Sequence, residues 1–191
     1  MNAQTNEGFN YSAYNPITTG VFANFTYPAR PLFEGTENLK SLTLKHGIFH
    51  PELNEHGYIK RMGAYLKYVE IADVTGDLHK EAIVALGNLC DCSGVWFAIY
   101  IYELQKQKPG RLLWAFHTGD RAYGGLKRVY ALKSRLVLEL YGHGSGPNLP
   151  PPGYDGAYCC NEDYTRRSYK WNGRRFVQAG KARLLSTRGV R

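Results

Sequence analysis

Oxygen-bearing side chains suited to a hard cation lie close together in one short stretch of this chain. Asp73, Thr75, Asp77 and Glu81 fall at positions 1, 3, 5 and 9 of that stretch, a spacing by which a tight loop can wrap around Ca²⁺. Position 3 is a neutral hydroxyl, however, and Leu78 replaces the glycine of the sharp turn. The alternative, which the sequence favours, is an Asx-type turn in which the aspartates accept hydrogen bonds from backbone N–H groups.

Cysteine thiols are the second set of reactive groups, and they occur in two clusters. Cys90 and Cys92 are separated by one residue, whereas Cys159 and Cys160 are adjacent. Neither cluster has the two-residue spacer of a typical zinc knuckle, and neither pair is well placed to form a disulfide within itself. We therefore expect one or two disulfides between the clusters, which requires an oxidising compartment; a Zn²⁺ or Cu⁺ thiolate site is the alternative.

Positive charge is concentrated towards the C-terminal end. The net charge is +8, yet residues 164–191 carry nine Lys or Arg and no acid, so the first 163 residues carry a net charge of −1. A β-hairpin is predicted there, with strands at 164–171 and 174–177 joined by an Asn172-Gly173 turn. Its candidate binding residues are basic or aromatic: Arg166, Arg167, Lys170, Trp171, Arg174 and Arg175. They suit an anionic partner such as nucleic acid, lipid head groups or an acidic protein, and equally an ordinary solvated hairpin.

Short alternating segments separated by turn residues must position these groups, and the sequence shows no amphipathic helix of ten or more residues. The apolar stretch 95–104 predicts a central strand covered on both faces, and segments 126–132 and 136–141 predict a hairpin. The expected fold class is all-β, a mostly antiparallel sandwich or partly closed barrel, with a long Gly/Pro loop at 142–156.

The length of the chain, 191 residues, favours one domain with one good core. We expect three parts: an extended N-terminal arm at residues 1–23, a single β domain at 24–180 and a basic C-terminal tail at 181–191. The three parts have different compositions, since the arm is rich in Asn, Thr, Tyr and Gly without periodicity, and the tail is rich in Arg.

Several segments resemble a family of uncharacterised exported bacterial β proteins, of the type frequent in acidobacteria and cyanobacteria. The matching segments are Asn24-Phe-Thr-Tyr-Pro28, the 73–77 and 81–84 stretches, residues 118–126 and 136–141, Cys159-Cys160, and residues 169–173 with Phe176. This resemblance implies an exported β protein and no particular activity. The Asp73-Val-Thr-Gly-Asp77 turn separately resembles the calcium-binding repeats of integrin-type propellers, in a single degenerate copy with Leu78 in place of the glycine.

The N-terminal residues bear on the compartment. Residues 1–9 contain neither the basic nor the apolar segment of a signal peptide, and no run approaches the ~18 apolar residues of a membrane span. Together with the cysteine pattern, this favours a mature periplasmic or extracellular chain whose signal has been removed. A cytoplasmic protein is the alternative.

The absence of recognisable catalytic motifs makes an enzyme the less favoured class, since the sequence contains neither a nucleophile elbow nor a phosphate-binding loop. The favoured function is a non-catalytic secreted or periplasmic binding or accessory module, docked through a protein partner on a larger envelope or membrane complex. One alternative is a metal-dependent hydrolase that uses the 73–81 turn with Asp120. The other alternative is that the basic hairpin binds an anionic surface or nucleic acid. Of these two partners, nucleic acid is the less favoured. The sequence does not indicate the oligomeric state.

Overall fold

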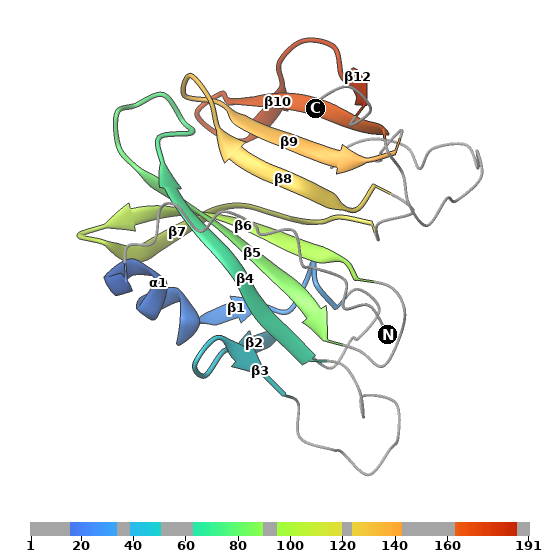
Figure 1. Ribbon diagram of the computed structural model, residues 1–191. Helices are drawn as coiled ribbons and strands as arrows, with labels where there is room; N and C mark the ends of the chain where they lie inside the picture. Colours follow the sequence, from blue (N-terminus) through green and yellow to red (C-terminus); the bar gives the residue numbers. More distant parts are fainter. Residues whose placement is uncertain are drawn as a thin grey trace, which may run out of the picture.

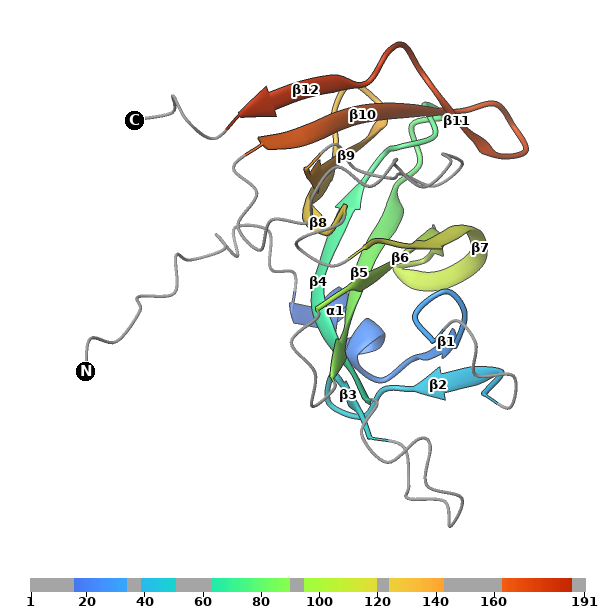
Figure 2. The same cartoon turned by 90° about the vertical axis from the view of Figure 1, so that its right-hand side faces the viewer.

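The computed structural model describes residues 16–33, 39–50, 63–89, 95–119, 124–142 and 163–186. In these residues, one short helix and twelve strands form three layers (Figures 1 and 2). A five-stranded sheet lies in the middle, a second five-stranded sheet packs on one side of it, and the helix with a two-stranded sheet covers the other. The predicted all-β, mostly antiparallel sandwich is confirmed, and the described strands form no closed barrel.

The central sheet is an antiparallel meander. Its strands, in spatial and chain order, are β3 (Ile48–Phe49), β4 (Gly63–Ala72), β5 (Glu81–Leu89), β6 (Phe97–Gln105) and β7 (Lys108–His117). Alternate residues of β5 enter two different cores, since Ile83 packs toward the second sheet and Val84 packs away from it. The predicted central strand is confirmed as β6, which pairs with β5 on one edge and β7 on the other.

The second sheet carries most of the basic residues discussed below. Its strands are β8 (Leu126–Ala131), β9 (Leu136–Tyr141), β10 (Asp163–Trp171), β11 (Phe176–Gln178) and β12 (Arg183–Ser186). β9 pairs with β8 and β10, while the other edge of β10 pairs with β12 near its start and with β11 near its end. The predicted β8–β9 hairpin is confirmed, with Lys133 and Ser134 at its tip, both at a φ of 51°.

Apolar side chains fill the space between the two large sheets, and polar side chains of β4 connect the sheets at one edge. The buried apolar residues of this core are Val74, Ile83, Ala85, Ile99, Ile101, Phe116, Leu126, Val129, Leu136, Leu138, Leu140, Tyr169 and Phe176. The hydroxyl of Tyr68 donates to the carbonyl oxygen of Val129 at 3.2 Å, and Glu70 Oε1 accepts the N–H of Ala131 at 3.1 Å. These bonds satisfy backbone groups along β8, an edge strand among the described residues.

In the third layer, the part of the predicted extended arm that the structure describes is helical rather than extended. Residues Pro16–Ala23 form α1, followed by β1 (Thr26–Pro28), which pairs with β2 (Ser41–Thr43). Phe22 is fully buried and its carbonyl oxygen accepts the hydroxyl of Tyr27 at 2.7 Å. Burial of this aromatic ring explains the helix, because eight residues are too short to be helical without tertiary packing. Residues 1–15 of the predicted arm lie outside the described residues, and no described helix is long and apolar enough to cross a membrane.

Two local predictions near the C-terminus also need correction. The predicted basic tail begins as a strand, since Arg183–Ser186 pairs as β12 with the open edge of β10. The predicted hairpin exists as β10–β11, but its turn is shifted by one residue. Asn172 occupies the first turn position, where its N–H donates to the carbonyl oxygen of Arg175 and its side chain accepts the N–H groups of Arg174 and Arg175.

Candidate functional site

The acidic turn between β4 and β5 is held by its own carboxylates. Asp73 Oδ1 accepts the N–H groups of Thr75 at 3.1 Å and Gly76 at 2.6 Å, and Asp77 Oδ1 accepts the N–H of His79 at 2.9 Å. These are the bonds of the Asx alternative. The sharp bend that calcium loops make with glycine is made here by Leu78 itself, which has a φ of 70° and an exposed side chain.

Glu81, the last of the predicted calcium ligands, points into the protein. It is 2 % exposed, and its two carboxylate oxygens accept the buried N–H of Val74 at 2.9 Å and the hydroxyl of Thr75 at 3.4 Å. Burial raises the pKa of Glu81, and the nearby charges of Asp77 and Asp73 add to that rise, against the lowering effect of the Val74 N–H. Thr75 therefore donates to Glu81 rather than facing a shared ion site.

The remaining oxygen of Asp73 contacts the second sheet. Asp73 Oδ2 accepts the hydroxyl of Ser134, at the tip of the β8–β9 hairpin, at 2.9 Å. Burial alone would raise the pKa of Asp73, but hydrogen bonds from Gly76, Ser134, Leu78 and Thr75 keep it below its ordinary value. Among the described residues no group of three or more His, Cys, Asp or Glu could hold a metal ion. The calcium site thus remains a prediction that rests on sequence spacing.

Other predicted site residues fall in segments about which the structure gives no description. They are Asp120 and the four cysteines Cys90, Cys92, Cys159 and Cys160, and most of the 142–156 loop lies there as well. The hydrolase pairing of Asp120 with the acidic turn, and the disulfides or thiolate site, therefore remain predictions.

The residues predicted as a basic binding hairpin do not share one surface. Arg167 is 6 % exposed and lies on the inward side of β10, and Trp171 packs against Phe176 at 5.0 Å between ring centroids. Burial lowers the pKa of Arg167. Arg174 and Arg175 sit in the exposed β10–β11 turn. Of the predicted set, Arg166 and Lys170 remain on the outward side of the sheet, because side chains alternate along the strand.

Glu139 occupies the centre of this outward side. It is a direct cross-strand partner of Arg128 on β8 and of Arg166 on β10, and Arg166 is in turn opposite Arg183 on β12. Residues directly opposite one another in a sheet project from the same face. Three arginines and one glutamate therefore form a single line across four strands, which we call the arginine row: Arg128, Glu139, Arg166 and Arg183.

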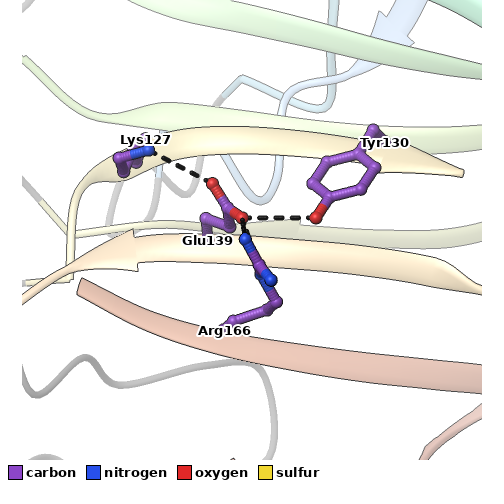
Figure 3. Close-up of polar contacts among 4 residues, drawn as sticks. All are labelled: Lys127, Tyr130, Glu139 and Arg166. Atoms are coloured by element: carbon purple, nitrogen blue, oxygen red, sulfur yellow. Dashed lines mark hydrogen bonds and ion pairs between the residues drawn. The ribbon is translucent and has the colours of Figure 1, made fainter. Parts of the chain in front are cut away.

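The Glu139 carboxylate is bound by two cations and a phenol (Figure 3). Arg166 donates through Nε at 2.8 Å and through Nη2 at 2.7 Å to Glu139 Oε1, which also accepts the hydroxyl of Tyr130 at 3.2 Å. Lys127 Nζ, from the bulge in β8, donates to Oε2 at 3.3 Å. Burial on its own would raise the pKa of Glu139, but the bond from Arg166 and the charge of Lys127 outweigh it and lower the pKa.

Aromatic rings and hydroxyl groups flank the arginine row. Lys127 Nζ lies 4.2 Å from the ring centroid of Tyr164, and the guanidinium of Arg128 lies 4.5 Å from that of Tyr130. Cross-strand pairing places Tyr141 beside Tyr164 and Ser168 in line with Tyr130. We call the charged and hydroxyl-bearing residues on the outward side of the second sheet the basic face: the arginine row with Lys127, Tyr130, Tyr141, Tyr164, Ser168 and Lys170. The apolar residues Val137, Val177 and Leu185 share this side by cross-strand register.

Most of the basic face was not predicted from the sequence. Glu139 left a weak signal, as a lone acid between alternating leucines in the segment Leu136 to Tyr141. Lys127, Arg128 and Arg183 left no signal in the sequence, since only the strand register brings them to Arg166.

Comparisons with protein-family models, with curated proteins and with solved structures each found no match.

Proposed function

We propose that this β domain is a non-catalytic binding module and that the basic face is its binding surface for an anionic partner. The observation that carries the proposal is the arginine row, in which three arginines and one glutamate stand in line across four strands, and the carboxylate is bound by only one of the three arginines. The proposal keeps the sequence-based expectation of a binding module. It moves the predicted anion-binding surface from the β10–β11 hairpin to the sheet face.

The distribution of charge supports a role for this face. The described segments of the second sheet, residues 124–142 and 163–186, hold eleven Lys or Arg and two acids. The other described segments, residues 16–33, 39–50, 63–89 and 95–119, hold eight Lys or Arg and five acids. A surplus of one sign on one sheet raises the local concentration of oppositely charged partners and speeds their association.

The pairing of Arg166 with Arg183 supports a bound anion more directly. Like charges directly opposite each other in a sheet destabilise it, and Glu139 already binds Arg166 on the other side. An anionic group bound between the two guanidinium groups would remove that repulsion. Arginine suits such a group because its planar fork matches a carboxylate, sulfate or phosphate.

A charge-removal experiment tests the proposal. Binding of fluorescent heparin, used as a general polyanion, is measured by anisotropy at increasing salt for the wild type, for the double variant Arg166→Gln/Arg183→Gln, and for a matched control. The control is Lys108→Gln/Arg111→Gln, which removes two positive charges from β7 of the central sheet.

We expect wild-type affinity to fall as salt rises, and the basic-face variant to bind at least ~100-fold more weakly, because it loses two charged hydrogen bonds that each contribute about 1.5–3 kcal/mol. The β7 control should keep nearly all of its affinity. Absence of binding in dilute buffer, or equal losses in both double variants, would overturn the proposal.

The predicted export of the chain is a separate part of the proposal. The sequence supports it through the cysteine clusters and the resemblance to exported proteins, while the described residues leave both untested. Intact-mass spectrometry of natively isolated protein, with and without reductant, is the measurement. A loss of two or four protons together with a processed N-terminus is the expected result, and four free thiols would contradict export.

A further inference from the structure

We infer that the anionic partner is a linear acidic polysaccharide that lies across the strands of the second sheet, along the arginine row. The inference rests on the proposed function and adds the chemical class of the ligand and its direction on the face. Four features of the basic face support it: the shape of the row, the state of its aromatic rings, the absence of exposed apolar side chains, and the hydroxyl groups on either side.

The shape of the row matches an extended polymer. Its members are on four successive strands, and neighbouring strands are about 4.8 Å apart, so the row extends over roughly 15 Å. A single small anion would contact only the Arg166–Arg183 pair. Arg128 at the far end of the row has a second anionic group to bind only if the ligand is a chain with repeating charges.

The aromatic rings of the face argue against single-stranded nucleic acid. Proteins that bind single strands combine a basic groove with aromatic rings on which the bases stack. On this face Lys127 covers the ring of Tyr164 and Arg128 covers the ring of Tyr130. These cations occupy ring faces that a base would need, so the face offers contacts to charge rather than to planar bases.

The apolar residues argue against a lipid surface, which is bound by basic residues together with exposed apolar side chains. The exposed large hydrophobic residues in the described part of the chain are Ile48, Leu78, Val95, Leu132 and Leu184. Leu132 is in the β8–β9 turn, and Leu184 pairs with Thr165, a buried residue on the inward side of β10. None of the five lies on the outward side of the second sheet, where the apolar residues Val177 and Leu185 are half-buried.

Hydroxyl groups on both sides of the row complete the match to a sugar chain. Tyr130 and Ser168 lie on one side, and Tyr141 and Tyr164 on the other. Hydroxyls both donate and accept hydrogen bonds, as sugar hydroxyls do. Glu139 fixes Arg166 through Nε and Nη2 before any ligand arrives, so little side-chain freedom is lost on binding.

The test compares four probes at one ionic strength by isothermal titration calorimetry with the full chain. The probes are oligogalacturonate, an oligothymidylate of equal charge, vesicles that contain phosphatidylglycerol, and uncharged dextran. We expect oligogalacturonate to bind at least ~10-fold more tightly than the oligothymidylate, and dextran not to bind. The Arg166→Gln/Arg183→Gln variant should lose oligogalacturonate binding, while Lys108→Gln/Arg111→Gln should keep it.

The outcomes separate this inference from the proposed function. Equal or tighter binding of the oligothymidylate, or binding only to vesicles, overturns the polysaccharide inference and leaves an anion-binding module. Binding of no anionic probe overturns both. Oligogalacturonate binding that survives in the basic-face variant also overturns the inference, because the ligand would then lie elsewhere on the protein.

Discussion

Two buried glutamates, one on each large sheet, have opposite electrostatic environments. Glu81 on the central sheet is 2 % exposed and Glu139 on the second sheet is 3 % exposed, so burial alone does not distinguish them. Burial and two neighbouring aspartates raise the pKa of Glu81. The pKa of Glu139, which burial would also raise, is lowered by Arg166 and Lys127.

The difference shows which of the two sites keeps charge that is not neutralised within the protein. At the acidic turn, the carboxylates of Asp73 and Glu81 are used by nearby N–H and hydroxyl donors within the protein. On the basic face, the carboxylate of Glu139 pairs with two cations, Arg166 and Lys127, and a net positive charge remains, since Arg183 lies opposite Arg166. This difference is the reason that we propose a binding surface on the second sheet rather than at the acidic turn.

The largest predicted effect on stability follows from removal of Glu139. Glu139→Ala leaves Arg166 and Lys127 without their carboxylate, and we expect the free energy of unfolding to fall by about 2–3 kcal/mol. This value is below that of a fully buried pair, since the two cationic side chains are 36 % and 25 % exposed. Urea unfolding measures it.

The matched control for this prediction is an exposed ion pair. Glu103→Ala removes the carboxylate that pairs with Arg111 on the central sheet, where the arginine side chain is 64 % exposed. Its effect should be under about 1 kcal/mol. Equal losses in the two variants would mean that Glu139 has no special role in the basic face.

Local patterns in the sequence predicted the main strands of the sheets better than the short helix and the edge strand that pack against them. The segment 95–104, apolar on both faces, and the alternating segment 136–141 form β6 and β9, and both strands are largely buried as their side chains indicate. The helix at 16–23 and β12 escaped prediction, since each is stabilised by contact with a distant segment: Phe22 by the aromatic cluster beneath the central sheet, and β12 by the edge of β10.

The site was less predictable than the fold for a related reason. The alternation of side chains along the strand places Arg166 and Lys170 on one face and Arg167 and Trp171 on the other, but it does not indicate which face points inward. That choice follows from Leu138, which is opposite Arg167 and belongs to the core between the sheets. Local sequence patterns give the period of a strand, while the partner strand decides the direction.

The same conservative substitution should change stability in opposite directions at the two glutamates. Glu139→Gln loses the charge that holds two cations, so we expect a loss of about 1–2 kcal/mol. Glu81→Gln keeps an oxygen that can accept the Val74 N–H and removes repulsion from Asp73 and Asp77, so we expect a gain of about 0–1 kcal/mol. Urea unfolding at neutral pH measures both, and losses of equal size would contradict the comparison.

The pH dependence of stability should differ in sign between the two sites. The depressed pKa of Glu139 means that its contribution is present at neutral pH and is lost as the pH falls below the ordinary glutamate range through the folded-state value. The raised pKa of Glu81 means that its ionisation weakens the fold at neutral pH, and this cost disappears as the pH falls through the raised value.

Urea midpoints of the wild type and the two glutamine variants, followed from neutral into acid solution, test this sign. The advantage of Glu81→Gln should vanish first, above the ordinary glutamate range, and the deficit of Glu139→Gln should vanish later, below it. A deficit of Glu139→Gln that is constant with pH would show that lost packing, rather than lost charge, causes it.

The smallest expected effect concerns calcium at the acidic turn. Asp73 and Glu81 accept hydrogen bonds with both oxygens, and Asp77 accepts one from His79. A cation would have to displace several of these bonds. We therefore expect no change in the melting temperature on addition of Ca²⁺, measured against Mg²⁺ as the control. A calcium ion that did bind would raise the melting temperature measurably, since a ligand at 100 times its Kd stabilises a protein by about 2.7 kcal/mol. A calcium-specific rise that Asp77→Asn abolishes would contradict us and restore the metal site that the spacing of these residues suggests.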